Sequence, residues 1–218
     1  MALSRDANTE ARHRLVGQLQ EQGIDNLRVL DAFWQVPRHQ FIEPALQFRA
    51  YEDVTLPIGF QQTLSRPSVV AFQLQRALAR VPTPRFVLEI GSGSGYQTAL
   101  LTHLCLRVYS VERIAGLHQQ VDERLRRLGQ RNFRLRHGDG FEGWAQHAPY
   151  SVIIAAACAP DVPQAWIDQL APGGVMLMPV EQGQGQAMLE VHKDLEGNLN
   201  SMIVNDASFV PCLPGKVG

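Results

Sequence analysis

A cluster of glycines between two apolar segments is the first sign of chemistry in this chain. Three glycines within residues 91–95 follow the apolar residues 86–90 and precede an apolar-periodic segment at 96–104. Glycines let the backbone turn sharply, and a strand-to-helix turn places its amides at the ligand-binding edge of an α/β sheet. The dinucleotide fingerprint GxGxxG would need a glycine where this chain has Tyr96, so the spacing disfavours a nicotinamide cofactor.

Acidic residues follow the next two apolar segments. Glu112 lies about 20 positions after the glycines, where a carboxylate can accept hydrogen bonds from both hydroxyls of a ribose. Asp139-Gly140 follows a third apolar segment. Taken singly, each feature has a simpler interpretation. The glycines could form only a tight turn, Glu112 could be a solvated strand end, and Asp139-Gly140 could be an ordinary turn dipeptide. Their order and spacing together favour a cofactor site.

Such a site needs alternating strands and helices, and the apolar pattern predicts them. Strands are expected at 85–90, 108–111, 133–136, 151–157 and 175–180, with helices at 69–78, 96–104, 117–128 and 163–170. Residues 187–193 and 202–210 flank a turn and predict an antiparallel hairpin at the sheet edge. The fold class is therefore α/β: a doubly wound, mostly parallel Rossmann-like sheet with an antiparallel C-terminal hairpin.

The N-terminal part differs from this core. Helical spacing predicts helices up to about residue 50. Residues 51–67 are rich in proline, glycine and polar residues and predict a loop without regular structure. We expect one domain over 1–218, with N-terminal helices and a site-covering loop at 1–67 and the cofactor-binding core at 68–218.

With Glu89 directly before the glycines, residues 89–95 resemble motif I of class I S-adenosylmethionine-dependent methyltransferases. The chain as a whole resembles a narrower family, the protein-L-isoaspartate (D-aspartate) O-methyltransferases. Generic methyltransferases lack the discriminating block, Leu56-Pro-Ile-Gly59 followed by Gln62-Thr-Leu-Ser65. Further matching stretches are Val36-Pro-Arg38, Ala50-Tyr51, Ser110-Val-Glu-Arg113, Arg136-His-Gly-Asp-Gly140 and Phe209-Val-Pro211.

The resemblance implies an activity and a set of site residues. The activity is methyl transfer from S-adenosylmethionine to the α-carboxylate of isoaspartyl residues in damaged proteins, whose methyl ester then closes to a succinimide. The implied catalytic residue is Ser65, and the implied substrate-binding residues are Thr63, Ser65 and Val210. The implied cofactor-binding residues are Glu89, Gly91, Ser92, Gly93, Ser94, Gly95, Glu112, Arg113, Asp139, Gly140 and Gln186, with Asp139 at the adenine amine.

Several of these roles have simpler alternatives. Thr63 either donates to the substrate carboxylate or caps the following helix. Gln186 contacts the cofactor's carboxylate end, the peptide, or only its own turn. For Ser65, no paired histidine and acid are apparent, so we expect a hydroxyl that orients one carboxylate oxygen and not a covalent nucleophile. A carboxylate is already nucleophilic at pH 7, so holding the reactants in line is the main requirement.

Departures from the family pattern keep two other functions open. Phe60 and Gln61 replace the usual residues before Gln-Thr, and Ser68, Ala156 and Ser208 also depart from it. The alternatives are a methyltransferase of the same fold with another acid or small-molecule substrate, and a non-catalytic cofactor-binding paralogue.

Composition narrows the partners. The 218 residues carry 20 Lys and Arg against 21 Asp and Glu, a formal net charge of −1, which disfavours nucleic-acid and membrane-surface binding. The longest apolar stretch, 152–160, is far shorter than the roughly 20 residues of a membrane span. Three cysteines without CxxC spacing predict reduced thiols, and seven histidines without HExxH predict no metal site. We therefore expect a cytoplasmic monomer whose partners are isoaspartyl-containing peptides and proteins.

Overall fold

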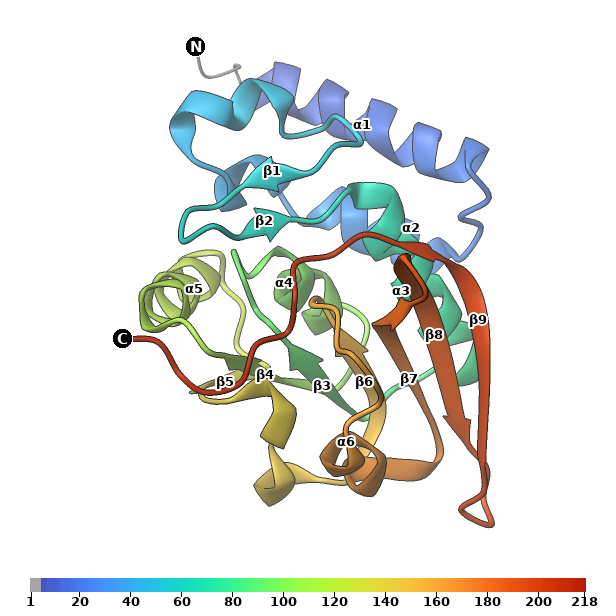
Figure 1. Cartoon of the computed structure of the whole chain (residues 1–218). Helices are drawn as coiled ribbons and strands as arrows, with labels where there is room; N and C mark the ends of the chain where they lie inside the picture. The colour runs from blue at the N-terminus through green and yellow to red at the C-terminus, as the bar shows by residue number, and fades with distance from the viewer. Residues whose placement is uncertain (1–4) are drawn as a thin grey trace.

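The structure is a computed structural model that describes residues 5–218. Within these residues seven strands form one sheet in the order β5-β4-β3-β6-β7-β8-β9 (Figure 1). The strands β3 to β7 pair in parallel, and β8 and β9 continue the sheet as antiparallel strands. Their bounds are β3 Phe86–Ile90, β4 Arg107–Glu112, β5 Phe133–His137, β6 Tyr150–Ala155, β7 Leu170–Gln182, β8 Gly185–Lys193 and β9 Leu199–Ala207. This architecture confirms the predicted fold class.

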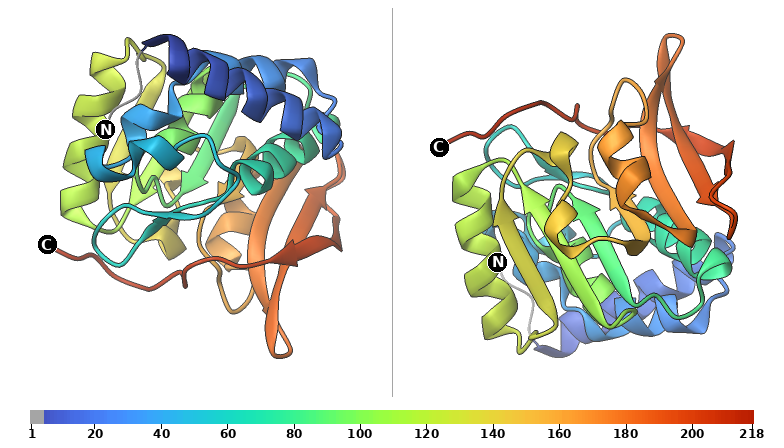
Figure 2. Two further views of the ribbon diagram at one scale, coloured as in Figure 1. Left: turned by 90° about the horizontal axis from the view of Figure 1, so that it is seen from above. Right: turned by 90° about the horizontal axis from the view of Figure 1, so that it is seen from below.

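Helices cover both faces of the sheet (Figure 2). Because side chains alternate along a strand, Val87 packs into one apolar core while Leu88 packs into the other. Helices α1 to α5 contribute to the first core, and Trp166 of α6 to the second. The bounds are α1 Arg5–Glu21, α2 Leu27–Gln35, α3 Pro67–Arg80, α4 Tyr96–Thr102, α5 Ala115–Arg127 and α6 Gln164–Gln169. Short 3-10 helices span Arg38–Phe41, Pro44–Arg49, Gly140–Glu142 and Ala145–His147.

The sheet reverses its winding order at β3, which pairs with β4 on one side and with β6 on the other. In open α/β sheets a crevice forms at such a switch point, beyond the carboxyl ends of the strands. The glycine-rich turn leaves β3 at this point, and Glu112 ends β4 beside it.

The predicted loop at 51–67 is partly wrong. Leu56–Pro57 (β1) and Thr63–Leu64 (β2) pair as a short antiparallel ladder, so this segment is a β-hairpin. Its tip is a turn closed by a hydrogen bond from the Gln62 amide to the Gly59 carbonyl, 2.8 Å. Phe60 and Gln61 at the tip both have positive φ, 51° and 57°. Such a turn normally carries Gly, Asn or Asp, so the residue types at 60 and 61 do not predict a hairpin.

A buried ion cluster fixes β8 against α3. The Glu190 carboxylate is 1% exposed and bonds Arg76 at 2.6 Å and Arg80 at 2.7 Å. Because β8 and β9 are hydrogen-bonded along their length, this cluster also places the C-terminal segment that follows β9. In Figure 1 that segment runs back across the front of the sheet towards α5.

No helix within residues 5–218 is long and apolar enough to cross a membrane.

Candidate active site

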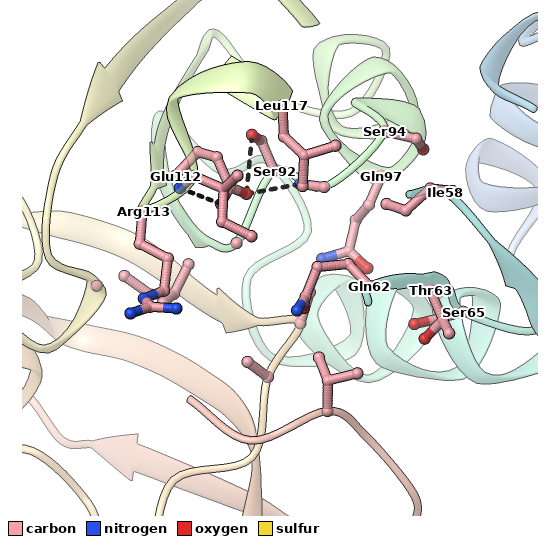
Figure 3. Close-up of a pocket in the computed structure, with 18 of the residues that line it drawn as sticks. Ile58, Gln62, Thr63, Ser65, Ser92, Ser94, Gln97, Glu112, Arg113 and Leu117 are labelled. Atoms are coloured by element: carbon pink, nitrogen blue, oxygen red, sulfur yellow. Dashed lines mark hydrogen bonds between the residues drawn. The ribbon is translucent and has the colours of Figure 1, made fainter. Parts of the chain in front are cut away.

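A deep pocket lies at the carboxyl ends of β3 and β4 (Figure 3). We call it the inner pocket. Its walls include the β1–β2 hairpin, the glycine-rich turn with the start of α4, the end of β4 with α5, the segments that follow β5 and β6, and the C-terminal segment. The lining residues with candidate chemistry are Gln62, Thr63, Ser65, Gly91, Ser92, Gly93, Ser94, Gln97, Glu112, Arg113, Gly140, Val210 and Cys212.

A second depression adjoins the inner pocket, and we call it the outer groove. It is lined by Thr55, Thr63, Ser65, Arg66, Val69, Ala156, Asp206, Ala207, Ser208, Phe209 and Val210. Thr63, Ser65, Ala156 and Val210 line both spaces. The catalytic and substrate-binding residues expected from the sequence therefore stand at the junction of the two spaces.

Glu112 is held rigidly within the inner pocket. Its carboxylate accepts hydrogen bonds from the amides of Gly93 at 3.0 Å and Ile114 at 2.9 Å. The Ser92 hydroxyl lies 3.5 Å from it. These bonds join the glycine-rich turn to the end of β4, and Figure 3 shows the carboxylate between the two. A fixed carboxylate at this place suits a ribose diol.

Glycines are required at two positions around this pocket. Gly95 has φ of +86°, and a Cβ there would lie 2.8 Å from Val121 of α5. A Cβ at Gly140 would lie 2.8 Å from the side chain of Ile90. The Trp166 indole donates to the Gly140 carbonyl at 2.9 Å, which fixes this turn from below. Both glycines therefore allow close packing of the elements that form the pocket wall.

Glu89 lies beneath the pocket and does not line it. Its carboxylate is fully buried and accepts from the hydroxyls of Thr98 at 2.5 Å and Ser110 at 2.6 Å. Its other oxygen, Oε1, has no partner within residues 5–218. Burial raises the pKa of Glu89 from 4.5 to about 7, and the nearby Glu112 acts in the same direction.

Asp139, Gln186 and Gly95 also lie outside the lining of the inner pocket. Both carboxylate oxygens of Asp139 accept backbone amides, from Phe141 at 2.9 Å and from Gly215 at 2.6 Å. The Gln186 side chain bonds both backbone groups of Phe209, at 2.7 and 3.1 Å. These two residues hold the C-terminal segment in place, a role that their local sequence does not reveal because their partners are distant in the chain.

The hydroxyls at the junction are free. Within residues 5–218 neither Thr63 nor Ser65 makes a side-chain hydrogen bond, and α3 begins without a side-chain cap. Capping is therefore not the role of Thr63. No histidine lines either space, which agrees with a serine that does not act as a covalent nucleophile.

The segment that carries Ser65 is anchored from behind. Arg38 is completely buried and donates to the Ser65 carbonyl at 2.8 Å, while its guanidinium lies 4.7 Å from the centre of the Tyr96 ring. Desolvation lowers the pKa of Arg38, and no carboxylate within residues 5–218 pairs with it. Asp53 accepts from the Ser68 amide at 2.8 Å and also pairs with Arg66.

The N-terminal helices support the site without entering it. Within the described chain, no lining residue of the inner pocket precedes Ile58. The expectation that both these helices and the 51–67 segment cover the site is therefore right only for the 51–67 segment. Ile58 packs against the glycine-rich turn, where a Cβ on Gly93 would lie 3.3 Å from its Cδ1.

Sequence reasoning assigned no role to several lining residues. Gln97 lies two residues after the glycine-rich turn, and Gln62 precedes Thr63. Their position in the sequence next to these motifs could have indicated that they line the pocket. Cys212 and Leu213 line the opposite wall through the return of the C-terminal segment. No group of three or more His, Cys, Asp or Glu side chains suited to a metal ion occurs in the described part of the chain.

Comparisons with known proteins identify the family of this chain. The family model described as Protein-L-isoaspartate(D-aspartate) O-methyltransferase (PCMT) matches residues 10–216. A protein-L-isoaspartate O-methyltransferase of Pseudomonas syringae pv. tomato is 48% identical over 94% of this chain and 97% of its own. One from Pseudomonas aeruginosa is 46% identical with the same coverage.

Solved structures extend the likeness. A Plasmodium falciparum protein assigned to the same enzyme family, solved with S-adenosyl-L-homocysteine, superposes with a TM-score of 0.80 at 25% identity. The match covers 92% of this chain and 97% of that one. The family model spans nearly the whole chain, so this chain belongs to the protein-L-isoaspartate (D-aspartate) O-methyltransferase family.

Proposed function

We propose that this chain methylates the α-carboxylate of isoaspartyl residues in damaged proteins, with S-adenosylmethionine as methyl donor. The observation that carries the proposal is the junction at Thr63 and Ser65, whose hydroxyls have no hydrogen-bond partner within residues 5–218 and which line both the inner pocket and the outer groove. The family membership and the identity of 48% to a curated relative support this function over a methyltransferase with another substrate and over a non-catalytic paralogue.

S-adenosylmethionine supplies an activated methyl group on a sulfonium. A substrate carboxylate oxygen forms the new C–O bond as the C–S bond breaks, and the electron pair of that bond stays on sulfur. No proton has to move, because the carboxylate is already ionised at neutral pH. The protein therefore needs to hold the carboxylate in line and to exclude water.

The pocket residues suit these tasks. Glu112 is the proposed acceptor for the ribose hydroxyls, and the turn at 91–95 approaches the cofactor closely. Gly140 and Arg113 line the end proposed for the adenine. Glu89, Asp139 and Gln186 act indirectly in this proposal, because each supports a wall of the pocket.

Ser65 is the proposed catalytic residue. Its hydroxyl donates to one oxygen of the substrate carboxylate, which directs the other oxygen at the methyl group. Arg38 keeps the segment in place through the Ser65 carbonyl, so the hydroxyl remains free to turn towards the substrate. Thr63 provides a second hydroxyl at the same junction.

The peptide chain is proposed to lie in the outer groove. Gln186 already bonds the backbone of Phe209, and the Val210 carbonyl accepts from the Cys158 amide at 2.8 Å. These groups are thus unavailable for strand-like pairing with a peptide, and Val210 contributes its side chain to the groove. Few fixed polar contacts suit an enzyme that accepts many sequences around one damaged linkage.

We further propose a cytoplasmic monomer that acts on protein substrates. The three cysteines are free, and burial raises the pKa of Cys105 to about 12 and that of Cys212 to about 11, which suits thiols kept reduced. Light scattering of the purified chain measures the oligomeric state, and a dimer mass would contradict this part.

The test is methyl transfer from labelled S-adenosylmethionine to an isoaspartyl peptide, with its normal-aspartyl twin as control. We expect base-labile methyl groups on the isoaspartyl peptide alone. Ser65→Ala should lose at least about tenfold in kcat, roughly 1.4 kcal/mol of transition-state stabilisation. Ser68→Ala is the matched control, since Ser68 lines neither space. Transfer to neither peptide would contradict the proposal.

A further inference from the structure

A buried amide in the inner pocket lacks a hydrogen-bond partner. Gln97 is the second residue of α4, and its side chain lines the pocket (Figure 3). The residue is only 8% exposed. Its Nε2 is buried, and within residues 5–218 it has no acceptor. Buried donors are nearly always satisfied in folded proteins, so a buried free donor in a binding pocket indicates an acceptor on the ligand.

The pocket itself narrows the choice of acceptor. Gln97 lines the inner pocket and is absent from the lining of the outer groove, where the peptide is proposed to lie. The ribose end is already assigned to Glu112, which is bonded to Gly93 and Ile114 at the far side of the glycine-rich turn. What remains near the start of α4 is the amino-acid end of the cofactor, whose carboxylate is a strong acceptor.

We propose that the Gln97 Nε2 donates a hydrogen bond to the carboxylate of the methionine portion of S-adenosylmethionine. This inference rests on the proposed function. It makes Gln97 a cofactor-binding residue in addition to those expected from the sequence.

A neutral donor has a physical advantage at this place. The methionine carboxylate is a short chain away from the sulfonium, and a lysine or arginine there would place a second positive charge near it. Of the residues that line the inner pocket, Arg113 is the one cation. Its guanidinium donates to the carbonyls of Pro214 and Gly215, at 3.2 and 3.3 Å. An amide binds the carboxylate without adding repulsion at the reacting centre.

The experiment compares two probes by titration calorimetry. S-adenosylhomocysteine carries the amino-acid end, and 5′-deoxy-5′-methylthioadenosine lacks it but keeps the adenosine and the sulfur. Gln97→Met keeps the length of the side chain and removes the donor. We expect it to weaken S-adenosylhomocysteine binding about tenfold, as for a lost hydrogen bond to a charged group, and to leave methylthioadenosine binding within about twofold.

Two further variants guard against a trivial result. Gln97→Glu places a carboxylate opposite a carboxylate, so we expect a larger loss for S-adenosylhomocysteine than in Gln97→Met. Gln20→Met makes the same replacement at an exposed position of α1 and should change neither affinity. Thermal unfolding of each variant shows whether the fold is retained.

The outcomes separate this inference from the proposed function. Equal losses for both probes would mean a packing role and would overturn the inference. Unchanged S-adenosylhomocysteine binding with a raised KM for the isoaspartyl peptide would assign the amide to the substrate and would also overturn it. Failure of the wild-type protein to bind either probe would instead contradict the proposed function.

Discussion

The two halves of the site differ in how their polar groups are bonded. In the cofactor half, the carboxylates of Glu112 and Asp139 each accept two backbone amides, so their positions are set before any ligand arrives. In the substrate half, the hydroxyls of Thr63 and Ser65 are free, and only the backbone behind Ser65 is anchored. The difference agrees with the proposed function, in which a donor site with fixed polar groups adjoins a groove that accepts many peptides.

The largest expected effect tests the rigidity of the cofactor half. Glu112→Ala removes the proposed ribose acceptor and releases the Gly93 and Ile114 amides. We expect S-adenosylhomocysteine affinity to fall about 100-fold or more, near 3 kcal/mol. Because the ribose is common to both probes, methylthioadenosine should lose as much. A loss below about fivefold in calorimetry would show that the two halves do not differ as described.

The next effect concerns the buried acid below the cofactor half. Glu89 has a pKa of about 7 in the folded chain, above its ordinary 4.5, so the folded state holds more protons than the unfolded state between these values. The free energy of unfolding should therefore decrease as pH rises from about 4.5 to 7. Glu89→Gln lacks this decrease, and relative to the wild type it should gain about 3 kcal/mol between pH 4.5 and 8.

Urea unfolding of the ligand-free protein at several pH values measures this gain. Glu190→Gln is the comparison, because Glu190 is equally buried but paired with Arg76 and Arg80. That replacement should destabilise the protein at neutral pH. If the free energy of unfolding changed with pH in the same way in the wild type and in Glu89→Gln, the prediction would be contradicted.

A smaller effect tests how the hairpin is held over the pocket. The Phe60 ring rests on Gly116 of α5, where a Cβ would lie 2.4 Å from Cζ of the ring. Gly116→Ala should displace the hairpin tip and weaken S-adenosylhomocysteine binding about fivefold, or roughly 1 kcal/mol. The loss should disappear in the Phe60→Ala background, because the smaller side chain removes the clash. A loss of the same size in both backgrounds would exclude the ring contact as its cause.

The smallest effect lies at the tip itself. Gln61 has φ of 57°, a conformation that costs a non-glycine residue energy. Gln61→Gly should raise the free energy of unfolding by about 0.5 kcal/mol, since the relief of strain exceeds the added chain entropy. Gln61→Ala should give no such gain, and chemical denaturation of both variants provides the measurement.

The sequence predicted the parts of the fold that depend on local pattern. The apolar segments around 86–90 and 108–111 lie within a few residues of β3 and β4, and Gly91 and Gly93 between β3 and α4 line the pocket. The turn at Phe60 and Gln61 was not predictable from residue type, because neither residue favours positive φ. Its ladder depends on packing against Gly116 and Gly93, which the local sequence does not contain.

The site was predictable to the same extent. Glu112 and Ser65 lie in the pocket because each belongs to a motif whose neighbours build the same wall. Asp139 bonds Gly215, 76 positions away, and Gln186 bonds Phe209 across the end of a strand pair. Such long-range partners leave no trace in spacing, and for the same reason the unpartnered amide of Gln97 was visible only in the folded chain.

The return of the C-terminal segment has a practical consequence for anyone who labels or immobilises this protein. Cys212 and Leu213 line the inner pocket, and the Val217 amide and carbonyl bond Arg113 and Ala115 at the pocket's edge. A tag or fusion partner joined after Gly218 is thus attached next to Val217, whose amide bonds the carbonyl of the lining residue Arg113. The start of α1 contributes nothing to that wall, which makes the N-terminal side the better place for an attached group.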